Sequence, residues 1–123
     1  MARASSAITT AWGRVAVILA PLVAKFGTQA QKDMVLPKVM AGDIFMALGL
    51  TEPGSGSDAG SLRTNAKKEG SHYLLNGTKT FITHGTVGDL FVVMARTRPP
   101  QPGHSSADGI SAFVLEKGMN GFR

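Results

Sequence analysis

The residues best suited to chemistry lie in one short segment, Leu50–Asp58, which reads Leu-Thr-Glu-Pro-Gly-Ser-Gly-Ser-Asp. Because glycine has no Cβ, backbone amides in such a segment can approach an anionic oxygen closely. Ser57 and Asp58 could then cap a short helical turn through Leu62, whose first amides would point at the same place. The hydroxyls of Thr51 and Ser57 can bond to phosphate, carbonyl or ring-nitrogen atoms. The segment predicts a phosphate-binding cradle, although an ordinary surface loop can have the same composition.

Two common phosphate-binding motifs are excluded by spacing. Gly54, Gly56 and Gly60 are spaced one residue too widely for the dinucleotide fingerprint, and the second half of the chain shows no alternation of strands and helices. No Gly-Lys-Ser/Thr sequence follows, so the segment is not a P-loop. A phosphate-binding cradle at this place must therefore be of another kind.

Three other polar residues could do chemistry, but each has a simpler interpretation. Glu52 could act as a base, yet its place beside Pro53 favours a role in the turn. His72 and His104 stand alone in loop-like contexts, and the chain has no cysteine. We therefore expect no metal site.

The composition fits an ordinary globular chain. Its 123 residues can form one modest domain, and the net charge of +5 is spread along the sequence. The densest basic group is Lys67-Lys68, which indicates a solvated surface rather than a nucleic-acid-binding stripe. The apolar run Val15–Ala24 is too short to cross a bilayer, which requires about 20 residues, and no signal-peptide cleavage site follows it. We therefore expect no nucleic-acid partner, no membrane span and no secretion.

Helical spacing dominates the first part of the chain, where one apolar stripe is formed by Ile8, Trp12, Val15, Leu19, Leu22 and Phe26. Trp12 lies on this stripe and is predicted to be a core residue. Pro21 should bend or break the helix, and Gly27 should end it.

A second helix is predicted after Gly27. Thr28 and Gln31 match a capping box, in which each side chain bonds to the backbone amide of the other residue. Ala41-Gly42-Asp43 should stop this helix, and its apolar side should be formed by Met34, Val35 and Met40. Neither helix can bury its apolar face alone.

From Ile44 onward, short apolar runs alternate with turn residues. Asn76-Gly77, a dipeptide typical of two-residue hairpins, predicts a turn between strands at Tyr73–Leu75 and Thr78–Thr83. The stretch Arg98–Asp108 is rich in Pro, Gly and Ser and predicts a solvent loop. Further strands are expected at Ile44–Leu50, Asp89–Ala95 and Ile110–Leu115. The predicted fold class is α+β, with a helical segment followed by antiparallel β-structure.

Four segments together resemble the acyl-CoA dehydrogenase family in order and spacing, over about residues 22–123. They are Lys25–Thr28 with Gln31-Lys32 and Leu36-Pro37, then Leu50–Asp58, Asn76–Thr83 and Gly109–Lys117. The resemblance implies that residues 1–43 are the end of the family's N-terminal helical domain. It implies that residues 44–123 are most of its barrel-like middle domain, which binds flavin and acyl-CoA, incomplete at the C-terminal end.

The resemblance also implies an activity. Members of the family use FAD to remove hydrogens from the α and β carbons of an acyl-CoA thioester, and pass the electrons to an electron-transfer flavoprotein or a similar acceptor. A full-length enzyme of this kind would be a homotetramer of fatty acid metabolism, in the bacterial cytoplasm or the mitochondrial matrix. A flavin monooxygenase or nitroalkane oxidase of the same superfamily, and a non-enzymatic domain that binds a phosphate ligand, remain alternatives.

The family's cofactor contacts can be carried over residue by residue. The resemblance implies that Leu48, Leu50 and Thr51 lie along the flavin ring edge. It implies that Gly56 and Ser57 meet the pyrophosphate, and that Ser57 also touches acyl-CoA.

A second group of contacts follows from the later match. Phe81, Ile82 and Thr83 would lie against the ring face, with Thr83 near the reactive flavin nitrogen. Phe81 replaces the usual tryptophan, and His84 replaces the usual asparagine. His84 could be a pH-sensitive neighbour of the site, but we interpret it as an exposed turn residue.

The resemblance assigns no catalytic residue to this chain. The family's base is a glutamate of the C-terminal helical domain, which would lie beyond Arg123. None of the eight carboxylates of the chain matches it by position. We therefore expect the chain alone to be inactive.

Overall fold

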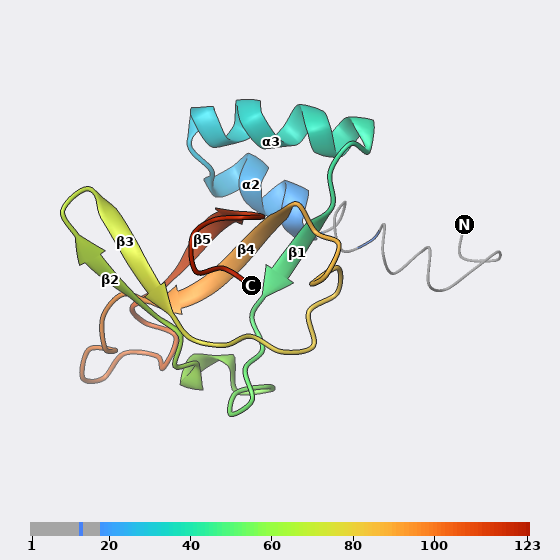
Figure 1. The fold of residues 1–123 in the computed structure, drawn as a ribbon. Coiled ribbons are helices and arrows are strands. Elements are labelled where there is room, and N and C mark those ends of the chain that lie inside the picture. Colours follow the sequence, from blue (N-terminus) through green and yellow to red (C-terminus); the bar gives the residue numbers. More distant parts are fainter. Residues whose placement is uncertain (1–12, 14–17) are drawn as a thin grey trace. The chain divides into compact units, whose positions relative to one another are not determined.

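The computed structural model describes residue 13 and residues 18–123, and Figure 1 shows their path. These residues form two compact units, which are described separately. The first unit comprises the described residues up to Leu48, together with Thr83–Phe91 and Glu116–Arg123. The second unit comprises Gly49–Ile82 and Val92–Leu115.

Two helices belong to the first unit, α2 (Ala20–Phe26) and α3 (Gln29–Ala41). Pro21 lies in the first turn of α2, where a proline is tolerated because its missing N–H would have no partner in the helix. Gly27 follows the last residue of α2, as predicted. Ile8, Trp12 and Val15, including the predicted core role of Trp12, lie outside the described residues.

The predicted capping box at the start of α3 is confirmed. The Thr28 hydroxyl accepts a hydrogen bond from the Gln31 amide at 3.3 Å, and the Gln31 side chain accepts one from the Thr28 amide at 2.9 Å. The helix ends at Gly42 as predicted, with a left-handed φ of 81° that lets its amide bond back to Lys38 and Val39.

The predicted apolar side of α3 is wrong in part. Val35 is fully buried, but Met34 is exposed and Met40 has 83% of its surface exposed. In α2 and the turn before it, Leu19 and Val23 are buried, whereas Phe26 is exposed. Which apolar side chains of a short helix are buried depends on where the helix meets the rest of its unit, and spacing alone does not fix this.

The strands of the described residues are β1 (Met46–Gly49), β2 (Asn65–Glu69), β3 (His72–Asn76), β4 (Leu90–Arg96) and β5 (Ile110–Glu116). They form one sheet in the order β1-β4-β2-β3, with β5 also paired to β4. The predicted order of helices followed by β-structure is confirmed.

The prediction of a wholly antiparallel sheet is wrong, because the sheet is mixed. Strand β2 runs antiparallel to β3 but parallel to β4, where Asn65 pairs with Arg96. The order of strands in the described residues is an open path rather than a closed ring, so the barrel-like closure implied by the resemblance is not seen in them.

The predicted hairpin turn at Asn76-Gly77 is also wrong. The β2–β3 hairpin turns at Gly70-Ser71, with Glu69 paired to His72, and Gly70 has the positive φ of 61° expected at the first position of a two-residue turn. Thr78–Thr83 is not a strand.

Gly77 is required for a different reason. A Cβ at this position would lie 2.7 Å from Thr64 Cα, which is closer than real Cβ atoms come. Gly77 therefore allows the chain to leave β3 close beside Thr64, and the local turn signal is overridden by this approach.

Four of the predicted strand segments contain strands at shifted bounds, but β2 was not predicted. Its sequence, Asn-Ala-Lys-Lys-Glu, is polar, and only Ala66 is buried. By contrast, β4 is almost entirely buried and was recognisable from its run of apolar residues. Pairing with two neighbours, rather than apolar pattern, makes β2 a strand.

Candidate functional site

The glycine-rich segment predicted as a cradle begins with a tight turn in the second unit. The amide of Glu52 donates to the Ser55 carbonyl at 2.9 Å, and the amide of Ser55 donates to the Glu52 carbonyl at 3.1 Å. The Ser55 hydroxyl then donates to the Asp58 carbonyl at 2.8 Å. The segment thus holds its shape through its own hydrogen bonds.

The helical turn predicted after the segment is present as a short 3-10 helix, η2 (Ala59–Ser61). The predicted capping by Ser57 and Asp58 is wrong, because no side chain caps this helix; Ser55 and Ser61 bond to the Asp58 carbonyl instead. A helix of three residues has only a weak dipole, so individual amides and hydroxyls matter more here.

The outer side of the segment is open. A Cβ at Gly54 or Gly56 would meet no atom within 4 Å, and neither glycine has a positive φ. Ser57 is exposed beside them. The described residues thus leave space around both glycines, and both have backbone conformations that other residues can adopt. A phosphate-bearing ligand could approach their backbone from solvent.

Glu52 is a buried charged residue of the second unit. Its side chain is 7% exposed, and it accepts hydrogen bonds from the amides of Arg63 at 2.7 Å and Thr64 at 2.9 Å. Burial raises the pKa of Glu52, but the Lys79 ammonium and these two amides outweigh this effect and lower the pKa to about 2. Glu52 is therefore an ionised residue whose carboxylate is bound by structural partners, in agreement with the predicted turn role.

Lys79 is the functional neighbour that sequence reasoning missed. Its ammonium group lies 2.8 Å from the Glu52 carboxylate and donates to the Leu50 carbonyl at 3.0 Å, with 11% of its side chain exposed. The next amide, of Thr80, donates to the Thr51 carbonyl at 2.9 Å. A buried carboxylate such as Glu52 needs a cation, and this need was the signal that could have led to Lys79.

Phe81 follows directly and is unusual in two respects. Its side chain is 95% exposed, and its φ of 56° lies in the left-handed region that bulky residues rarely adopt. Such strain is typical of functional positions. Because Thr80 is bonded to Thr51, the second unit brings Leu50 and Thr51 beside the segment that leads into Phe81 and Ile82.

The remaining predicted cofactor residues belong to the first unit. Leu48 lies in β1 and is half-buried, and Thr83 begins a turn that runs to Val87.

His84, also in the first unit, lies in the turn from Thr83 to Val87 as interpreted, but it is half-buried rather than exposed. Its ring nitrogen lies 3.2 Å from the Met46 carbonyl, and its ring packs 5.4 Å from that of Phe45. His84 has a left-handed φ of 65°, which is uncommon for residues other than glycine.

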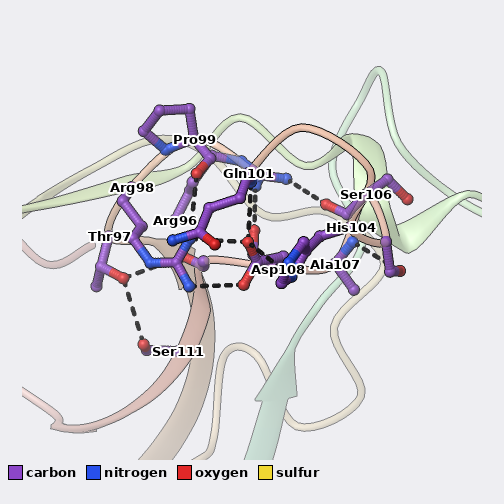
Figure 2. A network of polar contacts seen from close by, with 12 residues as sticks. Arg96, Thr97, Arg98, Pro99, Gln101, His104, Ser106, Ala107, Asp108 and Ser111 are labelled. Carbon is purple, nitrogen blue, oxygen red and sulfur yellow. Dashed lines mark hydrogen bonds and ion pairs between the residues drawn. The ribbon is translucent and has the colours of Figure 1, made fainter.

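The predicted solvent loop Arg98–Asp108 is exposed except at Asp108, which is half-buried. Figure 2 shows the polar contacts that hold this loop in place. The Arg98 guanidinium donates two hydrogen bonds, of 2.8 and 2.6 Å, to the Asp108 carboxylate. This pairing lowers the pKa of Asp108 to about 2. Arg96 donates to the carbonyls of Asp108 at 2.9 Å and Gly60 at 2.6 Å, which ties the loop to η2.

A hollow of about 360 Å³ lies on one side of the Glu52 turn. Its lining includes Arg63, Asn65, Asn76 and Thr78. None of the residues predicted to contact a cofactor lines this hollow. It therefore borders the predicted cradle at Glu52, Pro53 and Gly54, but it does not include the predicted cofactor contacts.

The part of the chain that the structure describes lacks two further features. No group of three or more His, Asp or Glu side chains there is arranged to hold a metal ion. No helix there has both the length and the apolar character needed to cross a membrane.

Comparison with known proteins gives the family. Residues 47–123 match the family described as acyl-CoA dehydrogenase, middle domain. An acyl-CoA dehydrogenase of Bacillus subtilis is 50% identical over 97 residues, which is 79% of this chain and 24% of the relative. The mitochondrial long-chain specific acyl-CoA dehydrogenase of rat (Rattus norvegicus) is 46% identical over 105 residues, which is 85% of this chain and 24% of the relative.

Solved structures agree with this family. Acyl-CoA dehydrogenase from Geobacillus kaustophilus superposes with a TM-score of 0.85 at 40% identity, over 91% of this chain and 29% of that one. An electron transferring flavoprotein structure of Acidaminococcus fermentans gives 0.78 at 46% identity, over 85% and 26%. Glutaryl-CoA dehydrogenase of Mycobacterium smegmatis in complex with FADH2 gives 0.73 at 34% identity, over 83% and 24%.

The mixed sheet, the glycine-rich turn and these matches define the class of protein. The chain belongs to the acyl-CoA dehydrogenase family. It spans about a quarter of the length of these curated relatives.

Proposed function

We propose that the protein carrying this chain is an FAD-dependent acyl-CoA dehydrogenase, an oxidoreductase that introduces a double bond between the α and β carbons of an acyl-CoA thioester. Family membership supports this activity. The observation on the chain itself that carries it is the exposed, strained Phe81, whose neighbour Thr80 is bonded to Thr51 at the edge of an open glycine-rich turn. An exposed aromatic ring beside such a turn suits a flat ring that bears a pyrophosphate.

The residues at the turn have chemistry that fits FAD. Thr51 uses its carbonyl for Thr80, while its amide and hydroxyl form no hydrogen bond within the described residues. We assign these two donors to the flavin ring edge, with Leu50 beside them. The open Gly56 and the exposed Ser57 are assigned to the pyrophosphate, and Ser57 also to acyl-CoA. FAD, when bound, supplies the hydride acceptor.

The other proposed contacts follow from the family match alone. Leu48 is assigned to the ring edge, and Ile82 and Thr83 are assigned with Phe81 to the ring face. The glutaryl-CoA dehydrogenase relative in complex with FADH2 supports the choice of cofactor. Donors placed at the ring edge would stabilise the negative charge that the ring gains on reduction.

A base must take the α-proton, and we propose that none of the described carboxylates does so. Four of the eight carboxylates of the chain accept hydrogen bonds within it: Asp33 from Gln29, Asp89 from Phe45, and Glu52 and Asp108 as described above. Glu69 pairs with Lys67 at the surface. For the whole protein, we also propose a base other than these carboxylates, a domain division between residues 43 and 44, and a closed, barrel-like middle domain.

The partners of the whole protein are also proposals. The electron transferring flavoprotein structure that resembles this chain supports such a flavoprotein as electron acceptor. The relatives include a bacterial and a mitochondrial protein, which supports either the bacterial cytoplasm or the mitochondrial matrix as the compartment. A homotetramer in lipid metabolism completes the proposed function.

The test is spectroscopic and uses the full-length protein. We expect the purified protein to show a flavin absorbance spectrum and to lose it under anaerobic conditions when an acyl-CoA is added. A protein without flavin would contradict the proposal. Bleaching by a nitroalkane but not by any acyl-CoA would instead favour the oxidase alternative.

A further inference from the structure

The ion pair between Glu52 and Lys79 is nearly closed to solvent. Its two side chains are 7% and 11% exposed, whereas those of the surface pair Glu69 and Lys67 are 42% and 75% exposed. A buried ion pair gains little net stability, because desolvation offsets most of its attraction, but it admits few alternative geometries. The Glu52–Lys79 pair is therefore better suited to fixing positions than to stabilising the fold.

The pair joins three segments of the second unit. The Glu52 carboxylate holds the amides of Arg63 and Thr64 at the entry to β2, and Lys79 holds the Leu50 carbonyl as well as the carboxylate. All these bonds lie between 2.7 and 3.0 Å. Replacing either charged group would therefore remove hydrogen bonds between segments that are 11 to 29 residues apart in sequence.

Residues on both sides of this pair are proposed flavin contacts. Leu50 and Thr51 directly precede Glu52, and Phe81 and Ile82 follow Lys79 after one intervening residue. We infer that the Glu52–Lys79 pair is a positioning pair, which aligns these two segments and thereby tunes the affinity and reduction potential of the flavin. This inference rests on the proposed function.

Hydrogen exchange separates a positional effect from an electrostatic one. As an ion pair, Glu52 and Lys79 are neutral overall, so they add little net field at a distance. If Lys79 is replaced by an apolar residue, Glu52 keeps the amides of Arg63 and Thr64, which favour its charged form, so the variant also changes the local charge. Faster exchange in both segments therefore reports displaced segments, whereas a change in flavin potential alone does not.

The experiment compares Lys79→Met with Lys79→Arg in the full-length protein, with Lys67→Met as the matched control at the surface. Hydrogen exchange of the flavin-free protein is measured first, at residues 50–55 and 78–82. FAD affinity and the reduction potential of the FAD-saturated protein follow. We expect Lys79→Met to speed exchange in both segments by about tenfold and to weaken FAD binding by about the same factor, as for one charge-assisted hydrogen bond.

The potential is expected to shift in Lys79→Met, to return toward the parent value in Lys79→Arg, and to stay unchanged in Lys67→Met. Unchanged exchange in Lys79→Met would overturn the inference. So would faster exchange with an unchanged potential and FAD affinity, because the pair would then be structural only. If Lys79→Met does not fold, Glu52→Gln carries the same measurements, since it removes the charge and keeps the shape.

The two proposals can fail separately. If the parent protein binds no FAD, the proposed function fails, while the exchange measurement still decides whether the pair aligns the two segments.

Discussion

The carboxylate of Glu52 holds two backbone amides and one ammonium group in a space closed to solvent. Such a group costs free energy when it loses its charge or its partner, because nothing else in the space can solvate it. Glu52 was visible in the sequence as a residue of the glycine-rich segment, but its partner Lys79 was not.

Acid should weaken the fold through Glu52. Its pKa of about 2 in the folded protein lies below the ordinary value of 4.5, so the unfolded chain binds more protons between these values. The stabilisation is present above about pH 4.5 and is lost as the pH falls toward 2. We expect Glu52→Gln to lower the free energy of unfolding by about 2 kcal/mol at pH 7 and by less at pH 3.

Urea unfolding at the two pH values measures this effect. Glu69→Gln is the control, because its side chain is exposed and its ion pair lies at the surface, and it should change the free energy of unfolding little at either pH. An equal loss in Glu52→Gln at both pH values would show that the charge of Glu52 is not responsible.

At the scale of elements, the start of α3 is the part that local sequence defines best. Both bonds of the capping box join residues three apart, Thr28 and Gln31. The apolar side of the same helix was predicted less well, since Met40 is exposed. Capping is local, whereas burial depends on what the helix meets.

Replacing the cap should destabilise α3 measurably. We expect Thr28→Ala to lower the free energy of unfolding by about 1 kcal/mol, because the Gln31 amide loses its acceptor. Thr28→Ser keeps a hydroxyl and should remain close to the parent. Helix content by circular dichroism during urea unfolding compares the three proteins, and a Thr28→Ala variant as stable as Thr28→Ser would contradict the role of the cap.

The hairpin between β2 and β3 shows two local signals in competition. Asn76-Gly77 and Gly70-Ser71 are both suitable for a two-residue turn, and the chain turns at Gly70-Ser71. Register decides the outcome, because pairing Asn65 with Asn76 brings β2 and β3 together along five residues each. It also brings Gly77 against Thr64, where no side chain fits.

At the scale of the whole molecule, the chain carries only part of what the proposed reaction needs. It spans 24% of the length of its Bacillus subtilis relative. The described residues offer an open turn, an exposed aromatic ring and a buried ion pair, and five of the eight carboxylates are held by structural bonds or surface pairing. Binding groups and a proton acceptor must both be present for dehydrogenation.

The 123-residue chain should therefore not catalyse the reaction alone. We expect no acyl-CoA-dependent dye reduction by the isolated chain with excess FAD, under conditions in which the full-length protein turns over. Turnover comparable to that of the full-length protein, abolished by replacing one of the eight carboxylates, would contradict this expectation.

The sequence by itself determined the features that depend on near neighbours or on the family pattern. These include the capping box at Thr28, the helix end at Gly42, the buried strand β4 and the glycine-rich turn. Each feature depends on bonds within a few residues or on a continuous apolar run, and both kinds of pattern are visible in the sequence alone.

Only the tertiary structure decided the features that depend on distant partners. Lys79 meets Glu52 across 27 positions, Arg96 reaches Gly60 across 36, and β2 becomes a strand through its neighbours rather than its own residues. Many lysines and carbonyls could satisfy such bonds in principle. The choice among them is made by the packing of the whole unit, which local propensity does not encode.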